Sequence, residues 1–428
     1  MKVLWVCNIM PPVIARQLEL PYSNREGWIS AMLDRFLQEQ HRNKITLGIA
    51  FPVSEETGNL DRELFLGEER SCKCYGFVED LNTPEQYDNA IEERMKQIIE
   101  DFKPDIVHIF GTEFPHALAC VRAYRRAPRT LISIQGLVSE CAEAYMADMP
   151  AKVQRMVTFR DIVKNDSIKQ QQKKFRKRGV YEKEAIRLAG CIAGRTDFDR
   201  ETTAKINPEA HYYVLNETLR SCFYHDRWRR NGCIPYSIFL SQGDYPLKGF
   251  HYLLQAMPIV LEQYPEAQIF VAGNNILQNA TWKDRIKRCA YGKYLNKLIR
   301  MNHLKEKVTM LGSLDAEGMK EQFLRSHLFV CPSALENSPN SLGEAMLLGV
   351  PCVAADVGGI HNMLIDGGDG LLYPKGSVEG LAEKILEIFN KELITERYSQ
   401  NASRHARETH DSDQNYYKLT RIYQEMAE

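Results

Sequence analysis

Short runs of apolar and β-branched residues alternate with amphipathic helical stretches along most of this chain. In the first half, the runs cover residues 3–8, 45–50, 106–110, 130–134 and 212–215. In the second half, they cover residues 238–241, 268–272, 308–311, 328–331 and 352–355. Strands that alternate with helices predict α/β units built on mainly parallel sheets. We therefore expect one such sheet in each half.

The chain is too long for a single ordinary domain. It has 428 residues, and a domain takes roughly 150. Residues 216–235 form a polar stretch without a sustained period, which indicates a linker. We expect domains at 1–228 and 229–410, with a cleft between them. Ligands of open α/β sheets bind at the carboxyl ends of the strands.

Charge and hydropathy exclude several classes of protein. Lys and Arg number 55 against 56 Asp and Glu, which argues against a surface devoted to nucleic acid. The mean hydropathy is −0.39, and no apolar run reaches about 18 residues, so no transmembrane helix is expected. The first residues lack the features of a signal peptide and predict a buried strand. The 11 scattered cysteines predict reduced thiols in a cytoplasmic protein, without a metal site.

One helix in the first half carries a start signal. Thr83 and Gln86 have the spacing of a capping box, and Pro84 suits the first helical position. Apolar residues follow at helical spacing as far as Phe102. The pattern predicts a helix that begins at Pro84.

Residues 332–346 carry the most chemistry. They follow the run 328–331 and open a helix that cannot contain Pro339. Glu336 is then expected in the entry loop and Glu344 in the first turns, where both carboxylates can face one crevice beside the helix amides. A diphosphate beside two hydroxyl-binding carboxylates fits a nucleotide sugar. The alternative is that Ser341 and Glu344 form a capping box and serve only their own helix.

Two further turns favour a phosphate site. Lys248 lies between a strand and the next helix, where its ammonium could bind a phosphate as a point charge. The alternative is an exposed turn lysine. Downstream, Gly358 and Gly359 follow the run 352–355, which lets a ligand approach the backbone.

The order of these segments is typical of one family. The series is Lys248-Gly249, residues 271–274, 311–314 and 331–333, the Glu336/Glu344 pair, residues 349–353, Gly358-Gly359 and residues 369–372. Over residues 236–390 the chain resembles the retaining glycosyltransferases of family 4. The resemblance implies the GT-B fold, an α/β architecture of two Rossmann-like domains that face each other across a cleft. It also implies a C-terminal helix, residues 411–428, that returns to the N-terminal domain.

The resemblance also implies roles for individual residues. Glu344 would bind the ribose hydroxyls of the donor, Glu336 the transferred sugar, and Lys248 the diphosphate. The other expected donor-binding residues are Asn340, Ser341, Leu342, Gly343, Gly273, Asn274, Ser313 and Leu314.

The implied reaction transfers a hexose from a nucleoside diphosphate sugar to a hydroxyl, with retention and without a metal or other cofactor. Its expected products are cell-surface polysaccharides or glycolipids, with lipid-linked glycans among the acceptors. Two alternatives remain: a nucleotide-sugar epimerase of the same architecture, and a non-catalytic partner subunit.

The chain departs from the family at several positions. Gly243 stands where members often have an arginine, and Gln135-Gly136 stands where many have a histidine. Arg195 and Arg220 are candidate replacements for the lost charge at the diphosphate. The alternative for both is a surface or interdomain ion pair.

Two features bear on the acceptor. His116 follows the strand 106–110 and is the candidate catalytic residue of the N-terminal half, whereas His108 lies within the strand and is expected to be buried. Between Lys164 and Arg178 the chain is strongly basic, with Asp166 as its single acid. We interpret this run as a peripheral contact with the inner face of a membrane, or else as a solvated helix face, and not as a nucleic-acid site.

Overall fold

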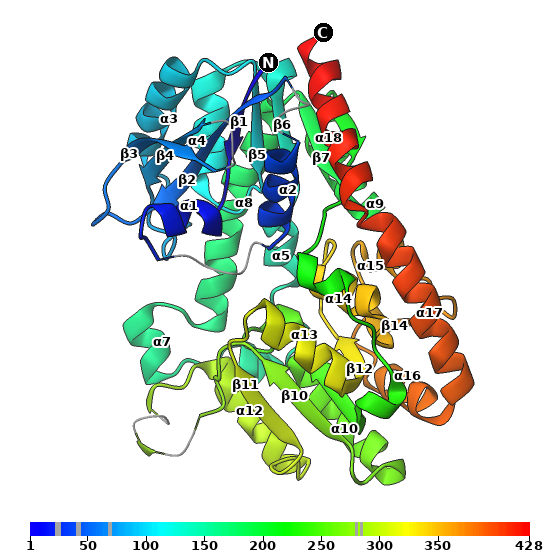
Figure 1. The fold of residues 1–428 in the computed structure, drawn as a ribbon. Helices are drawn as coiled ribbons and strands as arrows, with labels where there is room; N and C mark the ends of the chain where they lie inside the picture. Colours follow the sequence, from blue (N-terminus) through cyan, green and yellow to red (C-terminus); the bar gives the residue numbers. More distant parts are fainter. Residues whose placement is uncertain (22–26, 40–43, 67–70, 279–280, 283–285) are drawn as a thin grey trace. The chain divides into compact units, whose positions relative to one another are not determined.

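A computed structural model describes residues 1–21, 27–39, 44–66, 71–278, 281–282 and 286–428 (Figure 1). These residues form two compact units. The N-terminal unit comprises Met1–Glu140, Lys174–Arg220 and His410–Glu428, and the C-terminal unit comprises Cys141–Lys173 and Ser221–Thr409.

The N-terminal unit is built on an eight-stranded sheet in the order β3-β4-β2-β1-β5-β6-β7-β8. All neighbouring strands run parallel except β3, which is antiparallel to β4. The strands are β1 Lys2–Val6, β2 Thr46–Val53, β3 Leu60–Phe65, β4 Ser71–Val78, β5 Ile106–Phe110, β6 Thr130–Ser133, β7 Cys191–Gly194 and β8 His211–Val214.

Both faces of this sheet are covered by helices, as expected for parallel strands. Along β1, Val3 and Trp5 belong to the core on one face, while Leu4 and Val6 belong to the core on the other. The helices of this unit include α1 Pro12–Gln17, α2 Gly27–Gln38, α3 Asn89–Phe102, α4 Pro115–Tyr124, α9 Asp197–Ile206 and α18 Ser412–Ala427. Two helices, α5 Val138–Ala144 and α8 Ile168–Leu188, continue from one unit into the other.

The C-terminal unit has a six-stranded parallel sheet in the order β11-β10-β9-β12-β13-β14. Its strands are β9 Ile234–Leu240, β10 Gln268–Ala272, β11 Val308–Gly312, β12 Ser326–Cys331, β13 Cys352–Asp356 and β14 Leu371–Pro374. Its helices include α6 Ala151–Gln154, α7 Phe159–Lys164, α10 Phe250–Gln263, α12 Ala290–Met301, α13 Ala316–Arg325, α14 Asn340–Leu348, α15 Ile360–Met363, α16 Val378–Asn390 and α17 Glu392–Thr409. Among the described helices, none combines the length and the apolar character needed to cross a bilayer.

The expected α/β architecture of two mainly parallel sheets is confirmed, and every expected strand is present with its ends shifted by a few residues at most. The strands β3, β4, β7 and β14 were not expected. The helix predicted from Pro84 begins later, because Asp88 is its N-cap and accepts a hydrogen bond from Ala90 N. The amide of Gln86 instead donates to Thr83 O at 2.9 Å, which closes a turn.

Residues 141–173 belong to the C-terminal unit, whereas the expected boundary assigned them to the N-terminal domain. Long-range hydrogen bonds hold them there. His251 Nε2 lies 2.8 Å from Ala147 O, and the Tyr252 hydroxyl donates to Asp148 Oδ2 at 2.7 Å. The two residues of each pair are 104 residues apart in the sequence, so no local sequence pattern predicts these contacts.

The C-terminal helix α18 returns to the N-terminal unit, as expected. Tyr423 is fully buried, and its hydroxyl accepts a hydrogen bond from Trp5 Nε1 at 2.9 Å. The same hydroxyl forms a hydrogen bond with His108 Nδ1, 2.5 Å away. His108 is buried within β5, and burial lowers its pKa to about 3, which keeps the ring neutral.

Replacing Tyr423 with Phe should destabilise the N-terminal unit by about 2–4 kcal/mol, because Trp5 Nε1 and His108 Nδ1 would both lose the hydroxyl that is their buried hydrogen-bond partner. Urea unfolding followed by circular dichroism measures this loss. Tyr417→Phe on the same helix is the matched control, because Tyr417 is 54% exposed. Equal midpoints for the two variants would contradict the assignment.

Candidate active site

The candidate site lies at the carboxyl ends of three neighbouring strands of the C-terminal sheet. The 3₁₀ turn η4, Pro246–Lys248, follows β9, a loop at residues 332–339 follows β12, and a glycine turn follows β13. The sheet order changes direction between β9 and β12, and such a switch point is where open α/β sheets bind ligands.

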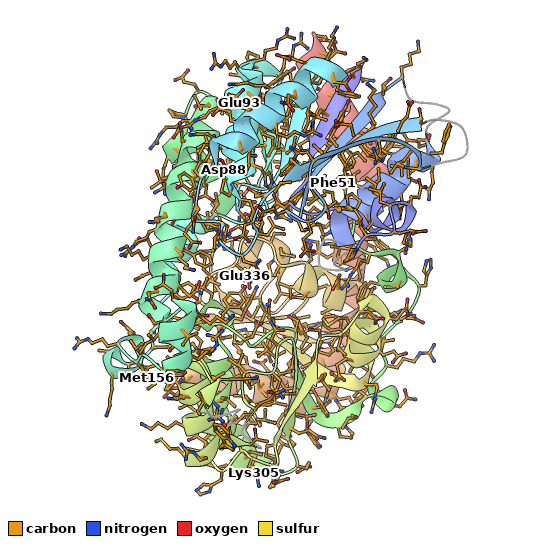
Figure 2. The ribbon with its side chains drawn as sticks, turned by 90° about the vertical axis from the view of Figure 1, so that its left-hand side faces the viewer. Phe51, Asp88, Glu93, Met156, Lys305 and Glu336 are labelled. Atoms are coloured by element: carbon orange, nitrogen blue, oxygen red, sulfur yellow. The ribbon has the colours of Figure 1, made fainter. Side chains whose placement is uncertain are left out.

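Lys248 and Glu336 are in direct contact. Lys248 Nζ donates to Glu336 Oε1 at 2.6 Å, and the Ser333 hydroxyl donates to the same oxygen at 2.7 Å. The lysine side chain is 22% exposed and that of Glu336, labelled in Figure 2, is 11% exposed. Burial alone would lower the pKa of Lys248, but the negative charge of Glu336 and the hydrogen bond raise it above its ordinary value. The lysine therefore remains an ammonium ion.

Two glycines allow the loops to meet. Gly249 has φ +68°, and a Cβ there would lie 1.8 Å from the carbonyl oxygen of Pro332. Gly358 has φ +54°, and a Cβ there would lie 2.0 Å from the carbonyl oxygen of Glu336. That carbonyl accepts a hydrogen bond from Gly359 N at 3.0 Å. The backbone on both sides of the Lys248–Glu336 contact is therefore packed too closely for any side chain.

Helix α14 continues from the loop that carries Glu336. Its N-cap is Pro339, which has no capping side chain, and its first residue is Asn340. Ser341 is therefore the second helical residue, and the capping-box alternative for Ser341 and Glu344 is wrong. An α-helix gives its first amides no internal partner, so the first turn of α14 offers donors to an anion.

The remaining expected donor-binding residues lie along the same sheet and helix. Leu342, Gly343 and Glu344 are buried in α14, with Glu344 4% exposed. Gly273 follows β10, and its amide donates to Gly312 O at the end of β11 at 2.9 Å. Asn274 Nδ2 donates to Asp244 Oδ2 at 2.8 Å. Ser313 and Leu314 follow β11 directly.

The packing around Gly243 explains one departure from the family. A Cβ at Gly243 would lie 2.9 Å from Val271 Cγ1 and 3.0 Å from Phe250 Cδ1. An arginine at this position would have to displace one of these two core side chains. Lys248, in the following turn, provides a positive charge after β9.

Arg195 and Arg220 both lie in the N-terminal unit. Arg195 Nη1 pairs with Glu217 Oε2 at 2.6 Å, and Nη2 donates to the carbonyl oxygens of Ile134 and Gln135 at 3.1 and 3.2 Å. The side chains of this pair are 6% and 9% exposed. Arg195 is thus engaged in a buried ion pair. The stem of Arg220 packs where a Cβ of Gly27 would lie.

His116 belongs to a chain of buried polar groups in the N-terminal unit. It is fully buried on α4, with Nδ1 2.6 Å from Glu79 Oε2 and Nε2 3.0 Å from Asn8 Oδ1. Asn8 Nδ2 in turn donates to Glu113 Oε2 at 2.8 Å. Burial raises the pKa of Glu113 above its ordinary value. Asn8 therefore links His116 to Glu113 by hydrogen bonds.

Of these four hydrogen-bonded residues, the sequence pattern indicated His116. It did not indicate the other three, each of which follows the end of a strand. Asn8 comes after β1, Glu79 directly after β4 and Glu113 after β5. Polar residues at the carboxyl ends of neighbouring parallel strands were the available signal.

A pocket of about 820 Å³ lies at the carboxyl ends of β1, β2 and β4 in the same unit. Glu79 is part of its wall, together with the acidic residues Glu55, Asp80 and Asp88. Its described lining contains no lysine or arginine. The pocket therefore suits a neutral or cationic polar molecule better than an anion.

Comparison with known proteins identifies the C-terminal half. The family described as Glycosyl transferases group 1 matches residues 228–405. Residues 228–405, about two fifths of the chain, are thus similar to group 1 glycosyltransferases. The resemblance seen in the sequence is thereby confirmed.

Similar curated proteins match over part of their length. The chain is 28% identical over 162 residues to a phosphatidyl-myo-inositol mannosyltransferase of Mycobacterium leprae, covering 38% of this chain and 39% of that protein. It is 24% identical over 156 residues to the alpha-D-kanosaminyltransferase of Streptomyces kanamyceticus, covering 36% and 37%. The match thus spans about two fifths of the length of these relatives.

Solved structures match over the whole chain. Sucrose-phosphate synthase from Thermosynechococcus elongatus superposes with a TM-score of 0.71 at 13% identity, covering 100% of this chain and 99% of that one. The Anabaena protein Alr3699/HepE, in complex with UDP-glucose, gives 0.64 at 15% identity, covering 99% and 100%. The expected GT-B fold is confirmed.

Gly358→Ala should displace the Glu336 backbone and weaken binding of a nucleotide sugar, in addition to the cost of about 1–2 kcal/mol for the left-handed φ. Gly367→Ala is the matched control, because Gly367 has φ +67° and a Cβ there would meet no neighbouring atom within 4 Å. Calorimetric titration and thermal unfolding of both variants separate the two effects. Equal losses of binding would show that Gly358 does not hold the site.

Proposed function

We propose that this chain is a retaining, metal-independent glycosyltransferase that transfers a hexose from a nucleoside diphosphate sugar to a hydroxyl acceptor. The observation that carries the proposal is the contact between Lys248 and Glu336 at the sheet switch point. Glu336 lies in the loop that leads into α14. A cation, a carboxylate and free helix amides in one place suit a diphosphate and the sugar attached to it.

In this proposal the ammonium of Lys248 and the first amides of α14 stabilise the negative charge that develops on the departing diphosphate. Lys248 is already held by Glu336, which accepts a hydrogen bond from Ser333, and the glycine turns fix the loops that carry both residues, so little reorganisation accompanies the reaction. A bound diphosphate would share the ammonium with Glu336, which turns that carboxylate toward the hydroxyls of the sugar.

Retention follows if the acceptor attacks from the side that the diphosphate leaves, with a diphosphate oxygen taking the acceptor proton. Glu336 and Glu344 then position the donor and are not the acid and base of a hydrolase. Lys248 already binds one of the two carboxylates. This contact favours a positioning role for Glu336.

The N-terminal unit would bind the acceptor. Its pocket and the Glu79–His116–Asn8–Glu113 chain supply carboxylates that can accept hydrogen bonds from hydroxyls. His116 is a positioning residue in this scheme, since it acts on Glu113 through Asn8.

The product is proposed to be a polysaccharide or glycolipid made at the inner face of a membrane. The phosphatidyl-myo-inositol mannosyltransferases carry a phospholipid in their name, and one structural neighbour is described as a glycosyltransferase involved in lipopolysaccharide biosynthesis. Between Lys164 and Arg178, the side chains of Lys169, Lys173, Arg176 and Lys177 are exposed, whereas Lys174 pairs with Glu85 at 3.2 Å. The exposed cations are the proposed peripheral contact.

Lys248→Ala should weaken binding of a nucleotide sugar by about 10- to 100-fold, because the diphosphate loses its charged partner. Isothermal titration with UDP-, GDP- and ADP-sugars measures this. Lys305→Ala in the same unit is the control, because the Lys305 side chain is 89% exposed (Figure 2).

Two outcomes would overturn the proposal. Wild-type protein that binds none of these donors would favour a non-catalytic partner subunit. Conversion of the donor sugar without an acceptor would indicate an epimerase. The anomeric configuration of the product, read by NMR, tests retention, and activity in excess chelator tests metal independence.

A further inference from the structure

The short helix α7 exposes an apolar face that no described part of the chain covers. Phe159, Ile162 and Val163 are 67%, 68% and 65% exposed, and Val157, just before the helix, is 55% exposed. Spacings of three and four residues place the first three on one side of the helix. Single exposed apolar residues are ordinary on protein surfaces, whereas a contiguous group indicates an interaction site.

Hydrogen bonds at both ends and on one side of α7 hold this apolar face in place. Thr158 and Asp161 form a capping box, and Asn165 ends the helix in the left-handed conformation. Asp161 is fully buried, and its Oδ2 also accepts a hydrogen bond from Ala290 N at 3.2 Å. One side of α7 is therefore tied to the start of α12 by this hydrogen bond, and the apolar side is left exposed.

The segment that contains α7 has an excess of basic residues, which favours a negatively charged partner. Residues 150–173 contain six basic residues against two acidic ones, Asp161 and Asp166. Asp161 is buried, and Asp166 pairs with Arg160 at 2.7 Å. The exposed cations of the segment are Lys152, Arg155, Lys164, Lys169 and Lys173. In Figure 2, Met156 marks this segment at the margin of the drawn side chains.

We propose that Val157 and α7 form a docking wedge that inserts into an anionic lipid bilayer. The four apolar side chains would enter the boundary between headgroups and acyl chains, and the surrounding lysines and Arg155 would bind anionic headgroups. A neutral or acidic protein groove would match the apolar face equally well. The excess of exposed cations in the same segment favours a continuous anionic surface.

The docking wedge adds apolar burial to the electrostatic membrane contact proposed for the basic run. Attraction between the basic run and headgroups is screened by salt, whereas burial of apolar side chains is not. The inference rests on the proposed function in one respect: an acceptor located in a membrane would require the enzyme to bind that membrane. Donor binding at Lys248 is measured independently of it.

The test is co-sedimentation with vesicles of phosphatidylglycerol and phosphatidylcholine, compared with phosphatidylcholine alone. Wild-type protein should bind the anionic vesicles and keep part of that binding in high salt. The triple variant Phe159→Ser/Ile162→Ser/Val163→Ser should lose at least about tenfold in affinity and all salt-resistant binding. The control Met301→Ser/Ile365→Ser/Leu393→Ser removes three exposed apolar side chains from separate parts of the same unit, and should bind like wild type.

A positive signal comes from Ile162→Trp, whose added fluorescence should shift to the blue on anionic vesicles and be quenched by bromine-labelled acyl chains. Equal binding by the triple variant and wild type would overturn the proposal. An absence of vesicle binding by wild-type protein would also overturn it. This holds whatever effect the triple variant has on self-association in size-exclusion chromatography. Unchanged thermal unfolding and donor binding of the triple variant would show that a loss of vesicle binding is local to α7.

Discussion

Two backbone contacts that only glycine allows hold the carboxyl-end loops of the C-terminal sheet together. At Gly249 the turn after β9 packs against the Pro332 carbonyl, and at Gly358 the turn after β13 packs against the Glu336 carbonyl. Both residues also have a positive φ, which a side chain would make costly. The meeting of Lys248 and Glu336 depends on this packing, since each side chain comes from a loop that one of the glycines holds in place.

The same packing accounts for how charge is arranged in the C-terminal unit. A core built from Val271 and Phe250 leaves no room for a side chain at Gly243, so an arginine could not be accommodated there without a shift. Lys248 lies five residues later and donates to Glu336 in the loop after β12, and the same carboxylate oxygen accepts a hydrogen bond from Ser333. A buried ammonium ion is costly unless it is paired, and Glu336 provides that pair.

In the N-terminal unit, buried polar groups form longer hydrogen-bonded series than the Lys248–Glu336 pair of the C-terminal unit. The N-terminal unit links groups from separate strand ends into chains: Glu79, His116, Asn8 and Glu113 at one place, and Arg195 with Glu217 at another. A third chain, through Trp5, Tyr423, His108 and Ser133, ties the C-terminal helix to the sheet. Each group is partnered within the unit, which is how polar atoms are tolerated in a protein interior.

The sequence by itself determined the alternation of strands and helices, the order of the glycosyltransferase segments and the start of α14, because periodicity, strand-end turns and Pro339 act over a few residues. It also selected Lys248 and Glu336, since each lies in the connection that follows a strand of a parallel sheet. Only the tertiary structure decided that residues 141–173 belong to the C-terminal unit, that Arg195 is paired with Glu217 and that His116 bonds to Glu79 and Asn8. The hydrogen-bond partners of residues 147, 148 and 116 lie 104, 104 and 108 residues away, so neither propensity nor spacing could specify them, and folding of the sheets brings them together.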